Sequence, residues 1–364
     1  MTKPTPAAGI DPDAFATLLC DWCLELLERD TVLVSTTPLA QPLVRAFHRA
    51  AIERGAWPPG LRISIPGIAE DFYRHAPDEL LDNYSPQDMA DAEQSDTFLS
   101  IQAPANTRAL AGIDPAVITR AARALEPVRE VRLGKRWCGT IWPTAALAQQ
   151  AGMSDDEYAA FVNRALFLDR PDPVAAWREL SDHQASLVDR LHDAREVRIE
   201  AEGTDLRLRV DGRTWINSNG RRNMPSGEVF TGPLEDSATG TIRFTIPSSP
   251  RGMLVEGVEL TFEEGRVTRA TADRGQGYLE AALASDPGAR FLGELGIGTN
   301  VGVDRPTGST LLDEKMAGTV HLALGRSYTE TGGRNKSALH WDLICDLRAG
   351  GRLSADGESI AVVG

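Results

Sequence analysis

The sequence predicts an α/β protein with an N-terminal three-layer α/β domain, whose sheet is mostly parallel, and a C-terminal β-rich α+β domain. Short apolar runs alternate with helix-like segments in the first half of the chain, which is typical of a parallel sheet covered by helices. After Ala194 the pattern changes to alternating, strand-like segments that end in glycine-containing turns. We therefore expect two domains, at residues 1–194 and 195–364, which suits a chain of 364 residues.

The composition, with 42% hydrophobic and 25% charged residues, is that of a globular protein. A net charge of −14 argues against nucleic acid or an anionic membrane as a partner, because both attract clustered cations. No apolar run has the length of a membrane span, and the N-terminal segment MTKPTPAAGIDPDAF lacks the apolar core of a signal peptide. We therefore expect a cytoplasmic protein with no membrane partner.

The first domain is expected to alternate helices and strands. The predicted elements are a helix over 12–29, a strand over 31–36, a helix that begins near Pro38 and Pro42 and ends near Arg54, strands over 61–67 and 95–103, a helix over 114–126 and a strand over 129–134. The first strand is followed by STTPLAQP and not by a G-x-G-x-x-G turn, so the sequence does not predict a dinucleotide site.

The four cysteines are interpreted as packing residues. Cys20 and Cys23 form a C-x-x-C motif, but they lie in a segment with helical apolar spacing, and no second C-x-x-C completes a zinc set. Cys138 and Cys345 are isolated in the sequence. Four cysteines in so long a chain also do not form a disulfide framework.

The middle of the chain leads from helices into β-structure. A tryptophan-rich segment over 137–166 contains MSDDE, which is an N-cap signature, and a further helix is expected over 172–193. The runs EVRIEAEG, DLRLRVDG and RTWINSNG follow, and their Asp-Gly and Asn-Gly dipeptides predict hairpins. From residue 195 onward we expect mainly strands, with a helix over 277–284 as the clearest exception.

Two expected strands near the C-terminus carry metal-ligand chemistry. His321 lies on a strand over 319–324, whereas His340 and Asp342 are two positions apart on a strand over 337–347 and share a face. The glycine-containing connection between them is long enough to return the chain antiparallel. Pairing would bring two imidazoles and a carboxylate together, which is the composition of a metal site. The alternative is a surface H-x-D pair and a structural histidine.

Two further carboxylates lie in segments of unusual composition. Glu228 follows a Pro-Ser-Gly turn and precedes a β-prone run, so its side chain is well placed to face a cavity. Glu294 lies between apolar residues in RFLGELGIGTN, and a buried carboxylate needs a partner such as a cation. The alternatives are an exposed turn residue for Glu228 and a buried salt bridge to an arginine for Glu294.

Taken together, these residues supply enough ligands for two divalent ions with positions left for water. The candidate metal ligands are Glu228, Glu294, His321, His340 and Asp342. Tyr328, between the two strands, could donate a hydrogen bond to a developing oxyanion. The C-terminal domain is therefore predicted to be the metal-binding one.

Several segments resemble the M29 family of metallo-aminopeptidases, of the aminopeptidase T type. These segments are WCGTIWPTAALAQQAGMS, NMPSGEVFTGP, FLGELGIGTN, HLALGRSY and HWDLICDLR. The resemblance implies a cytoplasmic homodimer that encloses its active sites and removes N-terminal residues from short peptides with two divalent ions, zinc, cobalt or manganese. Carried over by motif, it implies metal ligands at the five candidate positions and catalytic roles for Tyr328, Glu228 and Glu294.

A second enzyme class remains open from the sequence. His321, His340 and Asp342 alone form the two-histidine, one-carboxylate set of non-haem Fe(II) oxygenases. Dihydroxypyridine ring-cleaving dioxygenases resemble the M29 fold and share this type of site. Such a mononuclear site does not require Glu228 or Glu294. The compact connection TETGGRNKSAL after Tyr328, which should border the cavity, leaves the substrate range open.

Overall fold

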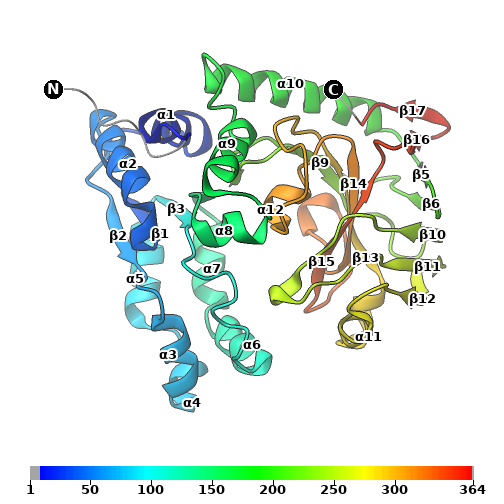
Figure 1. Cartoon of the computed structure of the whole chain (residues 1–364), viewed down its shortest axis with the longest axis horizontal. Coiled ribbons are helices and arrows are strands. Elements are labelled where there is room, and N and C mark those ends of the chain that lie inside the picture. The colour runs from blue at the N-terminus through cyan, green and yellow to red at the C-terminus, as the bar shows by residue number, and fades with distance from the viewer. Residues whose placement is uncertain (1–8, 363–364) are drawn as a thin grey trace. The chain divides into compact units, whose positions relative to one another are not determined.

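The computed structural model of the protein describes residues 9–362 and divides the chain into two compact units (Figure 1). The first unit ends at Trp177 and includes residues 220–225, and the second contains residues 178–219 and the chain from Ser226 onward. The division therefore falls inside helix α10 (Pro173–Leu191) and not after it, at Ala194. The reason is that the end of α10 packs into the core of the second unit. Among residues 9–362, no helix is both long and apolar enough to cross a membrane.

The first unit contains a parallel sheet with helices between its strands, as expected. Its strands, in spatial order, are β2 (Gly60–Ile63), β1 (Val32–Thr36), β3 (Thr97–Gln102), β4 (Arg136–Ile141) and β8 (Asn223–Met224). The helices are α1 (Pro12–Leu18), α2 (Gln41–Glu53), α3 (Ile68–His75), α4 (Asp78–Leu81), α5 (Pro86–Gln94), α6 (Pro115–Ala124), α7 (Glu126–Leu133), α8 (Ala145–Gln150) and α9 (Asp155–Ala165). The MSDDE signature begins α9, where Ser154 and Glu157 form a capping box.

Two expectations for the first unit are wrong. The segment 129–134, expected to be a strand, lies in helix α7 and the adjoining turn, and strand β4 begins only at Arg136. Val128 is buried and Val131 is half-buried, and their spacing of three positions is that of a helix. The charged residues between the apolar ones give the sequence the alternation of a strand, which explains the wrong prediction. The helix expected over 12–29 ends early, because α1 changes at Leu19 into a π-helical turn over Leu19–Cys23.

All four cysteines are buried and free, in agreement with their interpretation as packing residues. Burial raises the pKa of the Cys20 thiol to about 12 and that of the Cys345 thiol to about 11. Burial also raises the pKa of Cys23, together with a hydrogen bond to Cys138. The thiols of Cys20, Cys23 and Cys345 are therefore protonated at neutral pH.

The second unit consists mainly of two antiparallel sheets. The larger contains, in spatial order, β12 (Arg266–Thr271), β11 (Glu259–Glu263), β10 (Thr239–Arg243), β6 (Thr204–Arg209), β5 (Glu196–Ala201), β16 (Arg352–Ala355) and β17 (Glu358–Ile360). The smaller contains β15 (His340–Asp346), β14 (Thr319–Gly325), β13 (Leu292–Gly298), β9 (Glu228–Thr231) and β7 (Ile216–Ser218). Helix α11 (Gln276–Leu283) matches the helix expected over 277–284, and α12 (Thr310–Asp313) precedes β14.

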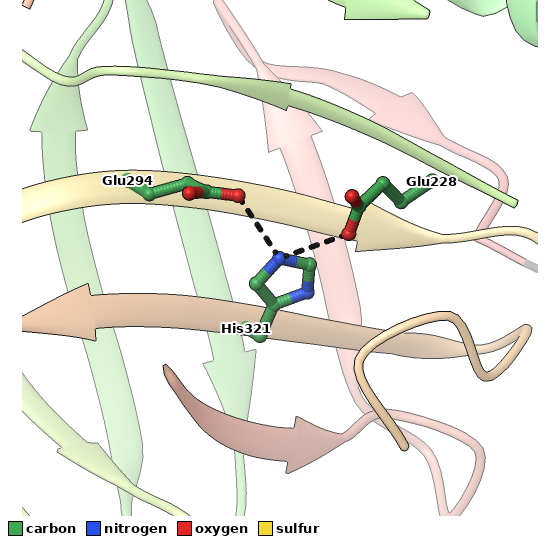
Figure 2. Close-up of side chains that lie close together, drawn as sticks. All are labelled: Glu228, Glu294 and His321. Carbon is green, nitrogen blue, oxygen red and sulfur yellow. Dashed lines mark hydrogen bonds and ion pairs between the residues drawn. The ribbon is translucent and has the colours of Figure 1, made fainter. Parts of the chain in front are cut away.

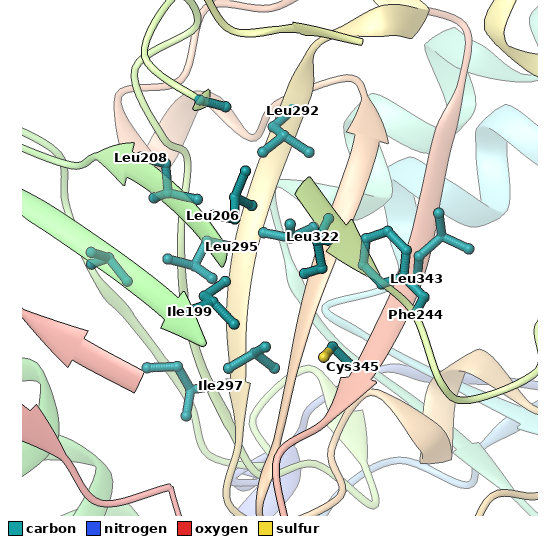
Figure 3. Packing of buried hydrophobic residues seen from close by; sticks show 14 of the residues in the cluster. Ile199, Leu206, Leu208, Phe244, Leu292, Leu295, Ile297, Leu322, Leu343 and Cys345 are labelled. Atoms are coloured by element: carbon teal, nitrogen blue, oxygen red, sulfur yellow. The ribbon is translucent and has the colours of Figure 1, made fainter. Parts of the chain in front are cut away.

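The core of the second unit is formed by apolar side chains from both antiparallel sheets (Figure 3). Leu295 and Ile297 of β13 and Leu322 of β14 pack with Ile199 and Leu206 of the larger sheet. Because side chains alternate along a strand, the intervening residues of β13 and β14 project from the opposite face of the smaller sheet. The core thus fixes which face of this sheet carries the polar residues.

The expected hairpins form only in part. Strands β5 and β6 pair around a tight turn at Glu202 and Gly203. The Asp-Gly dipeptide at Asp211 does not close a hairpin, because β6 pairs with β5 and β10 whereas β7 pairs with β9. The Asn-Gly dipeptide at Asn219 also does not, since the next strand, β8, joins the parallel sheet beside β4. Turn residues alone therefore did not determine which strands pair.

Candidate metal centre

The five candidate ligands lie on four adjacent strands of the smaller antiparallel sheet. Glu228 begins β9, Glu294 lies on β13 and His321 on β14, and the remaining pair lies on β15. His340 and Asp342 are both on the face opposite the core, because the alternate residues Trp341 and Leu343 belong to the core. The predicted antiparallel pairing of the two histidine-bearing strands is therefore confirmed.

The register of the strands brings the carboxylates of β13 and β15 toward each other across β14. Ala323 on β14 is paired with Glu294 on one side and with Asp342 on the other. A methyl side chain at this central position leaves room for both longer side chains above it. A slip of β13 or β15 by one residue would turn the carboxylate of that strand toward the core.

Gly296 makes room for the imidazole of His321, its partner across the β13–β14 pair. A methyl group on the Gly296 backbone would overlap Cε1 and Nε2 of His321. The ring therefore lies directly over the backbone of β13, between the two glutamates (Figure 2). This explains on steric grounds why a glycine follows Glu294 by two positions.

The first group of ligands is centred on His321, which is completely buried. Its Nε2 lies 3.3 Å from Oε2 of Glu228 and 3.3 Å from Oε1 of Glu294 (Figure 2). Both glutamates are only 5% exposed, so the three side chains form a closed polar cluster on the sheet. One ligand atom from each lies within 4.8 Å of the other two, a spacing that a metal ion could bridge.

The second group consists of Glu294, His340 and Asp342. Nε2 of His340 lies 3.5 Å from Oε2 of Glu294 and 3.5 Å from Oδ1 of Asp342. The other ring nitrogen of His340, Nδ1, lies 2.9 Å from the carbonyl oxygen of Arg326. A carbonyl only accepts, so Nδ1 carries a proton. In the neutral ring this leaves the lone pair on Nε2, which is the tautomer that a metal ligand requires.

The ligand groups argue against three alternatives that the sequence left open: an iron site, a salt bridge from Glu294 to an arginine, and an exposed Glu228. Within residues 9–362, no group of three potential ligands combines His321 and His340 with Asp342, as a mononuclear iron site would require. In the same range, the ion-pair partners of Glu294 are the two histidines and not an arginine. Glu228, at 5% exposure, is not an exposed turn residue.

Two charged residues of this cluster were missed by the sequence analysis. Glu314 forms a third group with His321 and Asp342, and the buried ammonium of Lys315 contacts both Glu228 and Glu314. A signal was present, because Asp313, Glu314 and Lys315 stand together between apolar residues just before β14. Three charges in an apolar context predict a buried polar cluster.

Burial and mutual repulsion perturb the acid–base properties of the cluster. Burial raises the pKa of Glu314 to about 7; Lys315 opposes the rise, and Glu228 and Asp342 add to it. Burial likewise raises the pKa of Asp342. For His321, burial alone would lower the pKa, but the hydrogen bond to Glu294 and the charge of Glu228 raise it to about 9. A crowded set of carboxylates that lacks enough positive charge is the expected electrostatic signature of a cation site.

Tyr328 follows β14 and borders the ligand cluster. Its ring packs edge-on against His340, with ring centres 5.1 Å apart, and against Phe230, with ring centres 5.7 Å apart. Burial raises the pKa of its hydroxyl, and the negative charges of Glu294 and Asp342 raise it further. The phenol is therefore protonated at neutral pH and available as a hydrogen-bond donor.

The cluster fits divalent cations in its donor chemistry. Oε2 of Glu228 and Nδ1 of His321 are buried and have no hydrogen-bond partner among the residues that the structure describes. Oε2 of Glu228 instead faces Nε2 of His321, so a cation that replaced the proton on this ring nitrogen would meet both a carboxylate oxygen and an imidazole lone pair. Carboxylate oxygen and imidazole nitrogen are the ligands that zinc and similar ions take.

Comparisons with known proteins relate the whole chain to one family. The model of a family described as thermophilic metalloprotease (M29) matches residues 11–363. The protein named aminopeptidase 2, from Geobacillus stearothermophilus, is 33% identical over 350 residues, which cover 87% of this chain and 83% of that protein. The protein named aminopeptidase T, from Thermus thermophilus, is 31% identical over 345 residues, which cover 84% of this chain and 82% of that protein.

A solved structure has the same fold. Wild-type AmpT from Thermus thermophilus matches with a TM-score of 0.82 and covers 96% of both chains at 24% sequence identity. The similarity extends over both units, and it agrees with the fold class expected from the sequence, in which a parallel α/β part precedes a β-rich part.

Proposed function

This chain belongs to the M29 family of metalloproteases, and we propose that it removes N-terminal residues from short peptides at a site that holds two divalent ions. It is a metallo-aminopeptidase, as its family and its similarity to proteins named aminopeptidases indicate. The number of ions, the activated water and the preference for short peptides are the parts that go beyond this family assignment.

The observation that carries the proposal is the position of Glu294 in both ligand groups. Its Oε1 faces His321 and its Oε2 faces His340. Glu294 would therefore help to hold both ions, one together with Glu228 and His321 and the other together with His340 and Asp342. This arrangement uses all five candidate ligands.

The charge of the cluster also supports two ions. The glutamates of both groups, Asp342 and Glu314 supply four carboxylates, and Lys315 supplies one ammonium. When bound metal keeps both imidazoles neutral and all four carboxylates ionised, three net negative charges remain on these residues. One divalent cation does not offset them, whereas two do.

The residues of the site have distinct expected tasks. Divalent ions bound here would lower the pKa of a coordinated water and so supply the nucleophile at neutral pH. Tyr328 would donate a hydrogen bond to the oxyanion that develops on the first peptide carbonyl. A carboxylate of the cluster can hold the free α-amine of the peptide, which would restrict cleavage to N-terminal residues. His340 is held in its tautomer by the carbonyl of Arg326.

We expect a chelator to abolish hydrolysis of an aminoacyl anilide, because the chain itself offers no other activated nucleophile in this cluster. Addition of zinc, cobalt or manganese should restore the rate, and elemental analysis of the purified protein should find two ions per chain. Activity that persists in chelator would exclude the metal mechanism. One iron per chain, with oxygen uptake on a dihydroxypyridine, would instead support the dioxygenase alternative.

Tyr328→Phe should lower kcat by roughly a hundredfold, which is typical of the loss of one oxyanion donor, and should leave the metal content unchanged. Tyr84→Phe is a matched control, because Tyr84 and Tyr328 are both 37% exposed and Tyr84 lies in the first unit. Steady-state kinetics and metal analysis of both variants test the role. A Tyr328→Phe enzyme with the kcat of the wild type would remove the hydroxyl from the mechanism.

The homodimer and the cytoplasmic location expected from the resemblance are also part of this proposal. Sedimentation of the purified protein would measure the first, and fractionation of the cells that produce it would measure the second.

A further inference from the structure

Lys315 is a fully buried lysine in direct contact with a candidate metal ligand. It is 1% exposed, and its Nζ donates to Oε1 of Glu228 at 2.5 Å and also to Oε1 of Glu314. Burial would lower the pKa of Lys315, but Glu228 and Glu314 raise it, so the side chain stays an ammonium. A buried cation beside a cation site requires an explanation, because it competes with the metal for the same carboxylate.

The backbone around Lys315 is held firmly. Its carbonyl accepts a hydrogen bond from the amide of Asn300 at 2.8 Å, and its own amide donates to the carbonyl of Leu312. Just before it, the carboxylate of Asp313 accepts bonds from the amide and hydroxyl of Thr307, both at 2.7 Å. Lys315 is thus a fixed part of the site and not a mobile surface side chain.

The two oxygens of Glu228 are in different surroundings. Oε1 is taken by the ammonium of Lys315, whereas Oε2 faces Nε2 of His321 at 3.3 Å and forms no hydrogen bond within the described chain. The ammonium therefore selects which oxygen can bind a metal and fixes the rotation of the carboxylate. Glu314 accepts a second hydrogen bond from the same ammonium.

We propose that Lys315 is a positioning residue that holds Glu228 as a one-oxygen ligand of the ion it shares with Glu294 and His321. This inference rests on the proposed two-ion site. The described contacts of the Lys315 ammonium are with Glu228 and Glu314, and neither of them belongs to the ligand group of Glu294, His340 and Asp342. Its removal should therefore weaken one ion position and leave the other unchanged.

If Lys315 acted only as a counter-ion, its removal would change metal affinity in the opposite direction. If Lys315 only offset negative charge, its removal would make the cluster more negative and both ions would bind more tightly. If it only supported the fold, both positions would weaken together. Positioning predicts weaker binding at one position, because hydrogen-bond partners of metal ligands typically change metal affinity by about 10–100-fold.

The test is a calorimetric titration of metal-free protein with cobalt(II) for the wild type, Lys315→Met and Lys315→Gln. Methionine removes both the charge and the donor, whereas glutamine removes only the charge and keeps an N–H donor for Glu228. We expect two equivalents for the wild type. In Lys315→Met, one equivalent should bind about 10–100-fold more weakly, and Lys315→Gln should recover much of that loss.

A double-mutant cycle with Glu228→Gln identifies the route of the effect. If Lys315 acts through Glu228, Lys315→Met should add little to the loss already caused by Glu228→Gln. Tighter binding in Lys315→Met, or equal weakening of both equivalents, would overturn the inference. A wild-type protein that binds a single equivalent would contradict the two-ion proposal instead, so the two failures are distinguishable. If Lys315→Met does not fold, the polar Lys315→Gln variant and the cycle built on it decide the question.

Discussion

Glu294→Gln is expected to abolish most of the peptidase turnover and most of the metal binding while the protein still folds. The substitution keeps the shape of the side chain and removes the charge that both ligand groups share. Because Glu294 faces both His321 and His340, its loss should weaken both ion positions. Loss of a residue that only hydrogen-bonds to a metal ligand typically lowers metal affinity by up to about a hundredfold. Because Glu294 is itself a proposed ligand, we expect its loss to lower metal affinity by at least this factor.

Melting temperatures with and without metal separate this role from a structural one. A ligand that binds only the folded state at about a hundred times its Kd adds about 2.7 kcal/mol of stability. The variant should lose this increment, so its melting temperature should rise much less on addition of metal than that of the wild type. If Glu294 were only structural, the metal-free variant would melt lower and the full increment on addition of metal would remain.

Asp346→Asn is the matched control for Glu294→Gln. Asp346 also lies on a strand of this sheet, but its carboxylate is paired with Arg348 at 2.7 Å and belongs to no ligand group. Its metal content and turnover should equal those of the wild type. Full activity and unchanged metal content in Glu294→Gln would remove Glu294 from the site. A variant that retains one ion would favour a mononuclear centre.

Gly296→Ala should disable the site by adding a single methyl group. The backbone at Gly296 does not require a positive φ, so alanine is permitted there, but its methyl group would overlap Cε1 and Nε2 of His321. Overpacking of this kind typically costs about 1–3 kcal/mol, and the imidazole can relieve it only by leaving its position. We expect turnover to fall by about a hundredfold or more and the ion held by Glu228 and His321 to be lost.

Gly277→Ala provides the control for Gly296→Ala, because a methyl group at Gly277 meets no atom within 4 Å. It should leave metal content and turnover unchanged. Metal titration of both variants is the measurement, and the ion held by His340 and Asp342 should survive in Gly296→Ala. Two ions and normal turnover in that variant would show that His321 does not occupy this position in the working enzyme.

Local patterns in the sequence predicted much of the architecture. The alternation of apolar strands and helices predicted the parallel sheet, and MSDDE predicted the start of α9. Prediction failed where one segment fits both a strand and a helix pattern. The charged residues over 129–134 alternate as in a strand, but the buried Val128 and half-buried Val131 are three positions apart, as in a helix. It also failed at Asp211 and Asn219, where turn dipeptides mark a change of direction but do not specify the partner strand.

The types of side chain in the candidate site could be predicted before the fold was known. Residue type and strand alternation were enough to place His340 and Asp342 on one face and to select Glu228 and Glu294 as partners. The membership of Glu294 in both ligand groups and the contact of Lys315 with Glu228 are evident only in the folded chain. The physical reason is that these relations depend on strand register and on the path of a loop, which join positions far apart in the chain. The alternation of residues within one strand predicts neither the register between strands nor the path of a loop.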